Sequence, residues 1–303
     1  MDKAWLSGKQ VFFLLCLFEL GTMTLGVGGR AGWLTCLVLG AAAAVLSLLL
    51  LPLRGREPAD VLRRLAGRRL GPVLAVALSL CGPVAAGRAM REAVDLWVLA
   101  GLEAHEWTAL LALSAVLLWL TALDVEALGR AAWLCWLPAA GLLALTLALA
   151  VPQARWSALR PLPEGLWAEV LARGRQPAAD LLLPLPLCLL ALAPHVRGKP
   201  HLPALGAAGC AFGLAALGAA RNTAVLGAAL VERLRAPTYF AATVLEPGKL
   251  GLLVLAAYLA ALPFRAALPL RLARRVLGAL WPAAPRPWPL VLAGLSLAAA
   301  FVF

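Results

Sequence analysis

The sequence predicts an all-α polytopic membrane protein of the inverted-repeat type with two broken helices, and three observations lead to this fold class. Hydrophobic residues make up 63% of the 303 residues and charged residues 14%, whereas a soluble domain has about 25% charged residues. The apolar residues form blocks long enough to cross a hydrocarbon core of about 30 Å. The first and the sixth of these blocks are interrupted by glycine or proline.

We expect about nine membrane spans, separated in two places by a longer amphipathic stretch. The spans are residues 10–28, 31–53, 71–99, 107–123, 131–151, 180–196, 202–226, 248–270 and 288–303. In the first amphipathic stretch, 54–70, arginines stand beside leucine and valine at helical spacing. The second stretch, 152–180, carries Trp156 and Trp167, and this composition is typical of a membrane interface.

The distribution of Lys and Arg predicts a cytoplasmic N-terminus. The net charge is +12, from 27 basic and 15 acidic residues. The basic residues stand mostly in short connections between apolar blocks, which indicates topology signals and anionic lipid head groups rather than nucleic acid as partners. With the N-terminus inside, most of them, including Arg265 near the end of the eighth span and Arg271 after it, fall on the cytoplasmic side.

The first and sixth spans are expected to break near the middle of the membrane. Four glycines fall between residues 21 and 29, and each is about 1 kcal/mol less favourable in a helix than alanine. The sixth span contains Pro184 and Pro186, which remove two backbone donors. Broken helices in corresponding halves are the pattern of inverted-repeat transporters, whose ligand binds at the breaks. The alternative is that these residues only kink tightly packed helices.

Three blocks of sequence carry a resemblance to a known family. They are Ser7–Leu15 with Phe18–Thr22, Ala193–Lys199, and Asn222–Gly227 followed by Leu230–Arg233 and Ala236–Pro237. These blocks resemble the spore germination permease family, the B subunits of germinant receptors in endospore-forming bacteria. The matches keep the family's order from residue 7 to about residue 280.

The resemblance implies a single transmembrane permease-like domain over residues 1–303, with the five-plus-five LeuT-type fold of the amino acid–polyamine–organocation superfamily. The first repeat would cover about residues 7–151 and the second about 180–303. The resemblance also implies a bacterial cell membrane or spore inner membrane location, a small amino acid-like germinant, and A and C receptor subunits as partners. The family has ten spans, so the second repeat is truncated here and the tenth helix is missing.

The resemblance places ligand contacts at both breaks, where free backbone amides and a helix dipole suit a carboxylate. The candidate ligand-binding residues are Thr24, Gly26, Val27 and Gly28 in the first span, and Leu183, Pro184 and Cys188 in the sixth. The family usually has a glycine where this chain has Pro184-Leu185, and an acidic residue where it has Lys249. Both departures put ligand coordination in question, and the alternative is that the glycine-rich segment serves only as a hinge.

Charged residues within the spans form the second group of candidates. Glu19 lies about 15 Å of helix rise beyond Lys9, near mid-membrane, where an ionisable group marks a functional site. Its role would be proton coupling or the counter-charge of a ligand ammonium; alternatively, it is a structural partner of Arg88 or Arg91, or a protonated carboxyl facing a cavity.

The third span carries four charged residues at helical spacing. They are Arg88, Arg91, Glu92 and Asp95. The i, i+4 spacing predicts an internal charge ladder. The alternative is a vestibule contact for a zwitterionic ligand, with Arg91 and Asp95 as the charge site.

Small residues in the seventh span, Gly209, Gly213 and Gly218, predict a face for close helix contact. The cysteines stand singly, and no metal-binding spacing, phosphate-binding loop or nucleophile motif occurs in the sequence. We therefore expect no metal, no cofactor and no enzymatic activity.

The sequence thus favours a B-type germinant receptor subunit that binds a small nutrient to trigger germination. One alternative is a proton- or ion-coupled transporter of amino acids or polyamines. Another is a structural receptor subunit that has lost ligand binding.

Overall fold

The computed structural model describes most of the chain. The described residues are 5–23, 29–49, 58–101, 105–160, 164–182, 188–189, 192–234, 236–245, 250–281 and 288–302. Within these ranges every regular element is a helix, and strand-like pairing is limited to one isolated bridge between Leu6 and Val196. The predicted all-α class is confirmed.

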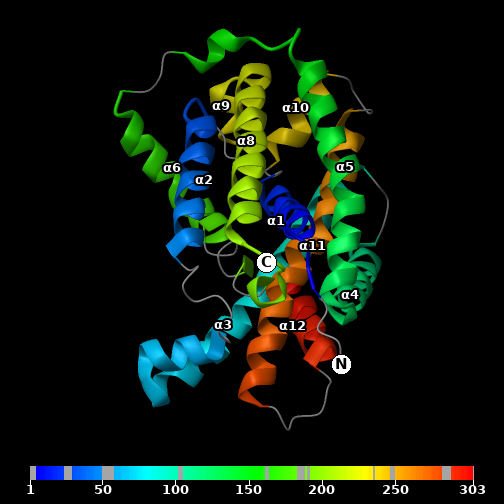
Figure 1. Ribbon diagram of the computed structural model, residues 1–303. Helices are drawn as coiled ribbons and strands as arrows, with labels where there is room; N and C mark the ends of the chain where they lie inside the picture. Colours follow the sequence, from blue (N-terminus) through cyan, green and yellow to red (C-terminus); the bar gives the residue numbers. More distant parts are fainter. Residues whose placement is uncertain are drawn as a thin grey trace.

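The described residues contain thirteen helical elements, which follow one another along the chain (Figure 1). The first half contains α1 (Gly8–Met23), α2 (Gly32–Leu49), α3 (Pro58–Leu99), α4 (Glu106–Ala122), α5 (Val125–Ala150) and the 3₁₀ turn η2 (Trp156–Leu159). The second half contains α6 (Leu166–Leu182), the 3₁₀ turn η3 (Ala193–His195), α8 (His201–Leu226), α9 (Ala228–Val231), α10 (Pro237–Leu245), α11 (Leu250–Leu280) and α12 (Trp288–Val302).

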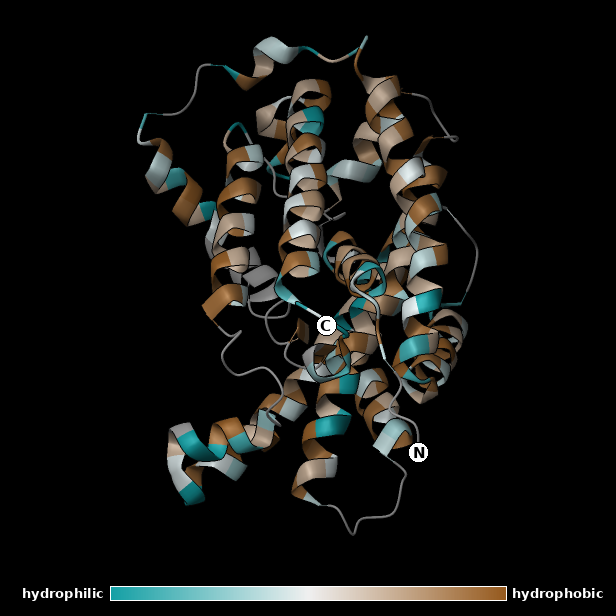
Figure 2. Cartoon of the chain, in the orientation of Figure 1, coloured by the Kyte–Doolittle hydropathy of each residue, from teal (hydrophilic) through white to brown (hydrophobic). Residues whose placement is uncertain are grey.

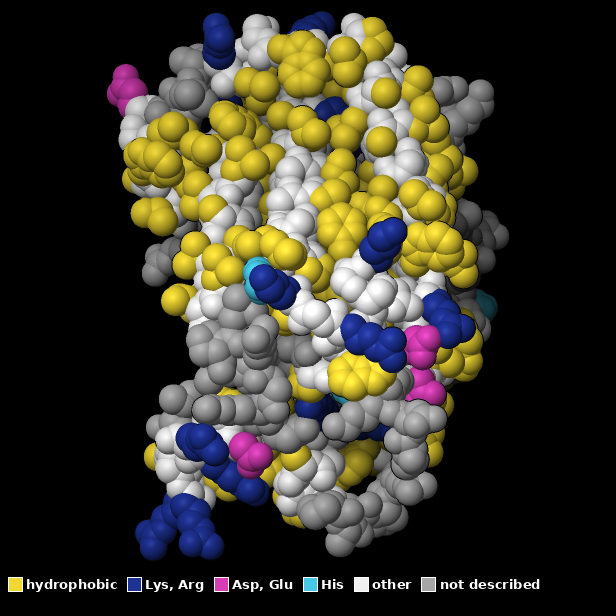
Figure 3. Space-filling view, viewed as in Figure 1, with side chains coloured by type: hydrophobic (Ala, Val, Ile, Leu, Met, Phe, Trp, Pro, Cys, Tyr) yellow, Lys and Arg dark blue, Asp and Glu magenta, His cyan; other side chains and the backbone are white. Residues whose placement is uncertain are grey.

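Several of these helices are suited to a bilayer. By length and composition, five are long and apolar enough to cross one: α2, residues 66–99 of α3, α5, α8 and α11. The apolar helices α4 and α12 have 17 and 15 residues. Figure 3 shows hydrophobic side chains spread over α2, α6, α8 and α5, while Lys and Arg gather in the lower half of this face. The chain is therefore a polytopic membrane protein, as predicted.

Two predicted boundaries are wrong. Helix α3 begins at Pro58, so it includes most of the stretch expected to lie between spans; Gly67, with φ of 80°, bends it there. The part before Gly67 projects from the bundle and is rich in hydrophilic residues (Figures 1 and 2). Helix α11 continues to Leu280, ten residues beyond the predicted end of the eighth span at 270, because Leu272 and Val276 pack against Ala59 and Ala75 of α3.

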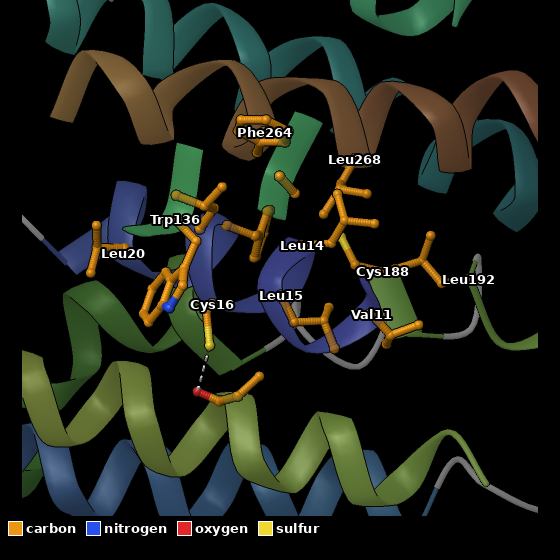
Figure 4. Packing of buried hydrophobic residues seen from close by; sticks show 14 of the residues in the cluster. Val11, Leu14, Leu15, Cys16, Leu20, Trp136, Cys188, Leu192, Phe264 and Leu268 are labelled. Atoms are coloured by element: carbon orange, nitrogen blue, oxygen red, sulfur yellow. Dashed lines mark hydrogen bonds between the residues drawn. The ribbon is translucent and has the colours of Figure 1, made fainter. Parts of the chain in front are cut away.

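Helix α1 lies at the centre of the bundle. Ser7 and Gln10 start it with a capping box: the Gln10 side chain accepts from the Ser7 backbone N–H at 2.8 Å, and the Ser7 hydroxyl accepts from Gln10 N–H at 3.3 Å. Leu14, Leu15 and other α1 side chains are fully buried in one cluster with residues of α5, α8 and α11. Figure 4 shows this packing, in which Cys16 Sγ donates to the Ala207 carbonyl of α8.

The start of α1 is joined to the end of the sixth-span segment by backbone hydrogen bonds. The Leu6 N–H donates to the His195 carbonyl at 2.6 Å, and the Arg197 N–H donates to the Leu6 carbonyl at 3.0 Å. Cys188 and Leu192 also pack into the core cluster around α1. The first and sixth spans therefore lie side by side where both are described, while the inverted repeat itself stays a prediction.

Close helix contacts occur at other glycines than expected. A Cβ on Gly82 of α3 would lie 2.7 Å from the Pro269 carbonyl oxygen of α11, and one on Gly87 would lie 2.5 Å from the Ser296 carbonyl oxygen of α12. Gly209 and Gly213 of α8 have no such neighbour within 4 Å among the described residues. The predicted contact face on the seventh span is wrong, and α3 carries that role.

Candidate ligand-binding site

Most of the predicted ligand-binding residues lie outside the described part of the chain. These are Thr24, Gly26, Val27 and Gly28 at the first break, and Leu183 and Pro184 at the sixth. Helix α1 ends at Met23, inside the predicted break, and the described backbone resumes at Gly29. The structure therefore shows the site through the residues around the end of α1 and around Gly29.

Both ends of the glycine-rich segment touch an arginine. At Gly21, the carbonyl accepts from Arg265 Nη1 at 3.1 Å, and a Cβ would lie 3.1 Å from Arg265 Cβ. Gly29 has φ of 92°, and a Cβ there would lie 2.3 Å from Arg173 Nη1. Thr223 Oγ1 of α8 donates to the Gly29 carbonyl at 3.0 Å. Segment 24–28 is thus bracketed by basic side chains from α11 and α6.

Arg265 connects three helices near the end of α1. It is 8% exposed on α11, forms an ion pair with Glu92 of α3, and donates to the Tyr258 hydroxyl at 3.2 Å. The sequence analysis counted it only as one of the basic residues on the cytoplasmic side, whereas the structure buries it between helices. A basic residue inside an apolar run was the signal that could have identified it.

At the other end, Arg173 holds α6 to the chain that follows α9. Its guanidinium binds Glu169 at 2.6 Å and Glu232 at 2.5 Å. Burial is the largest single influence on the pKa of Arg173 and lowers it. The hydrogen bonds and charges of Glu232 and Glu169 together outweigh burial, so the pKa is raised above its usual value. The sequence analysis did not single out Arg173, because Glu232 is 59 residues away along the chain.

Glu19 is fully buried on α1, two residues before Gly21. Neither carboxylate oxygen has a hydrogen-bond partner among the described residues. The structural pairing with Arg88 or Arg91, one of the alternatives from the sequence, is therefore not formed.

Arg88, Arg91 and their neighbours instead connect to one another and to α4. Arg88 pairs with Glu92 at 3.4 Å and Arg91 with Asp95 at 3.1 Å, the i, i+4 pairs that the spacing predicted. Arg91 also binds Glu106 of α4 at 3.0 Å. This ladder joins α3 to α4 and, through Glu92, to α11.

Cys188, the one predicted ligand-binding residue that the structure describes, is 1% exposed. Its side chain lies against Leu14 of α1 and beside Leu192 (Figure 4). In this arrangement Cys188 packs the sixth-span segment against α1.

A small cavity lies between α1, α5, α8 and α10, and its volume is about 40 Å³. Its polar wall is made by Thr146, Arg221, Asn222 and Thr238, and Leu20 of α1 is part of its apolar wall. Arg221 is 2% exposed, and the sequence analysis did not single it out because it stands near the end of an apolar block. The arrangement offers a buried cation beside free space.

Comparison with protein families gives a match over most of the chain. The model of a family described as spore germination protein matches residues 5–246. No curated protein matches the chain.

Proposed function

The chain belongs to the spore germination protein family, and from this we propose that it is a B-type germinant receptor subunit, a permease-like membrane protein that binds a small amino acid-like nutrient. It works in the inner membrane of the spore beside A and C receptor subunits. The nutrient shifts the population between two conformations through its differential affinity for them.

The observation that carries the proposal is the carboxyl group of Glu19, which has no hydrogen-bond partner among the described residues. A polar group without a hydrogen bond is costly in the membrane interior, and ionisable residues kept there mark ligand or ion pathways. Glu19 lies on α1 directly before the glycine-rich segment that the family resemblance assigns to ligand contact. In the proposal, Glu19 is the counter-charge for the ammonium group of the nutrient.

The experiment is a thermal-unfolding panel on the purified full-length protein, with the common L-amino acids and their N-acetyl derivatives. A ligand at about 100 times its Kd adds about 2.7 kcal/mol to the stability of the native state. We expect stabilisation by at least one amino acid, none by its N-acetyl derivative, and loss of the effect in Glu19→Gln.

Glu126→Gln is the matched control, since it makes the same chemical change in an exposed pair with Arg130. It should leave the response unchanged. If no amino acid stabilises the native protein, the nutrient-binding proposal is wrong and the structural-subunit alternative is favoured.

The same carboxyl group also favours a second candidate, a proton-coupled transporter of amino acids or polyamines, because buried carboxyls form proton relays in transporters. Vesicles containing the purified protein distinguish the two. A receptor binds the stabilising amino acid with little flux, whereas a transporter accumulates the labelled amino acid when a proton gradient is imposed.

The orientation with a cytoplasmic N-terminus is part of the proposal. Its support is the first part of α3, where Arg63, Arg64, Arg68 and Arg69 are exposed. Basic residues beside a membrane span favour the cytoplasmic side and anionic lipid head groups.

A further inference from the structure

The buried guanidinium of Arg221 on α8 donates hydrogen bonds to neutral groups. Its Nε and Nη2 donate to Asn222 Oδ1 at 3.1 and 2.6 Å, Nη1 donates to Thr146 Oγ1 at 3.1 Å, and Nη2 donates to the Thr238 carbonyl at 3.2 Å. Across the described ranges, no carboxylate pairs with it. These hydrogen bonds hold the cation in place, but no anionic side chain among the described residues balances its charge.

A purely structural role does not require this charge. Arg221 ties α8 to α5 and α10, and a neutral amide makes the same kind of hydrogen bond to a hydroxyl or a carbonyl group. A buried cation without a counter-ion costs several kcal/mol, and a basic side chain within a span generally faces a partner or a cavity. The charge therefore points to an anionic ligand.

The cavity beside Arg221 has the shape and polarity for such a ligand. Of the five N–H groups of a guanidinium, four are used here, and one on Nη1 stays available. The polar side chains lie on one part of the wall, while the rest is formed by leucine, alanine and glycine. A volume of about 40 Å³ accommodates about three water-sized groups, as in a carboxylate.

We propose that Arg221 binds the carboxylate of a small organic acid or amino acid in the cavity between α1, α5, α8 and α10. The inference rests on the proposed function only where this ligand is identified with the nutrient. Leu20 follows Glu19 on α1 and lines the same cavity, so a bound carboxylate contacts the helix that carries the proposed ammonium site.

The test variant is Asn222→Asp, which places a permanent carboxylate on the guanidinium without a change in shape. Asn222 Nδ2 now donates to Thr238 Oγ1 at 3.0 Å, and in the variant the threonine hydroxyl donates instead. The variant should fold, with a melting temperature equal to or above that of the native protein, because the buried cation gains its counter-ion.

Gln10→Glu is the matched control. It makes the same amide-to-acid change on α1, where Glu preserves the capping box with Ser7. The probes are propionate and L-alanine, with propionamide and L-alaninamide as their neutral-carbonyl counterparts, and the readout is the melting temperature of the full-length protein.

We expect propionate to stabilise the native protein and Gln10→Glu, propionamide to stabilise neither, and Asn222→Asp to lose at least nine tenths of the propionate shift. Equal shifts by propionate and propionamide on the native protein overturn the inference without any variant. The inference is also overturned if neither propionate nor L-alanine raises the melting temperature of the native protein. It is overturned as well if the propionate shift survives in Asn222→Asp.

The outcomes also separate this site from the proposed function. A propionate response without any amino acid response supports the Arg221 site and contradicts the nutrient assignment. An L-alanine response that persists in Asn222→Asp supports nutrient binding and contradicts the Arg221 site.

Discussion

The pairing of Arg265 with Glu92 predicts a specific pattern of stability losses. Arg265→Met removes the ion pair, the hydrogen bond to the Gly21 carbonyl and the one to Tyr258. Loss of one partner of a buried pair costs about 3–5 kcal/mol. Arg88 still lies 3.4 Å from Glu92, so we expect the lower end of this range, about 3 kcal/mol.

The Glu92→Gln variant completes a double-mutant cycle for this pair. Glu92→Gln alone removes the carboxylate that pairs with Arg265 and with Arg88, and in the double variant neither charge of the Arg265–Glu92 pair is present. Contacting residues show coupling energies of about 0.5–3 kcal/mol, and we expect about 2 kcal/mol here because both side chains are at most 13% exposed.

The assay is equilibrium unfolding of the full-length protein in mixed micelles with an increasing fraction of denaturing detergent. If the losses of the two single variants add up within about 0.5 kcal/mol in the double variant, the pair does not couple α3 to α11 and the reasoning is refuted.

Three further predictions concern glycine positions and topology. Gly29→Ala should destabilise the protein by more than Gly67→Ala. Both glycines have positive φ, which costs about 1–2 kcal/mol for alanine, but of the two only Gly29 has a guanidinium where the Cβ would lie. Equal losses of the two variants in thermal unfolding would contradict this. Gly87→Leu should destabilise by about 1–3 kcal/mol through overpacking, whereas Gly213→Leu should change the melting temperature little, since its Cβ position is open among the described residues. Cysteine at position 64, as Arg64→Cys in a cysteine-free background, should react with a membrane-impermeant maleimide from the cytoplasmic side alone; labelling from the outside would reverse the proposed orientation.

The class of the fold follows from the sequence because membrane spans depend on local composition. Helices α2, α5 and α8 fall within a few residues of the predicted spans 31–53, 131–151 and 202–226. The end of α11 was missed because the arginines after residue 270 favour a connection, whereas packing against α3 maintains the helix there.

The candidate site was less predictable, since it depends on contacts between distant residues. The spacing identified the Arg91–Asp95 pair, which lies within one helix turn. It gave no indication that Glu92 pairs with Arg265, 173 residues further on. Arg221 was missed for the same reason, because its neutral partners come from α5 and α10.

The main-chain clasp between Leu6 and the residues around Val196 has a mechanical consequence. Two backbone hydrogen bonds form it, so side-chain substitutions leave its donors and acceptors in place. The main chain therefore ties the entrance of the first span to the exit of the sixth, whatever side chains stand at Leu6 and Val196.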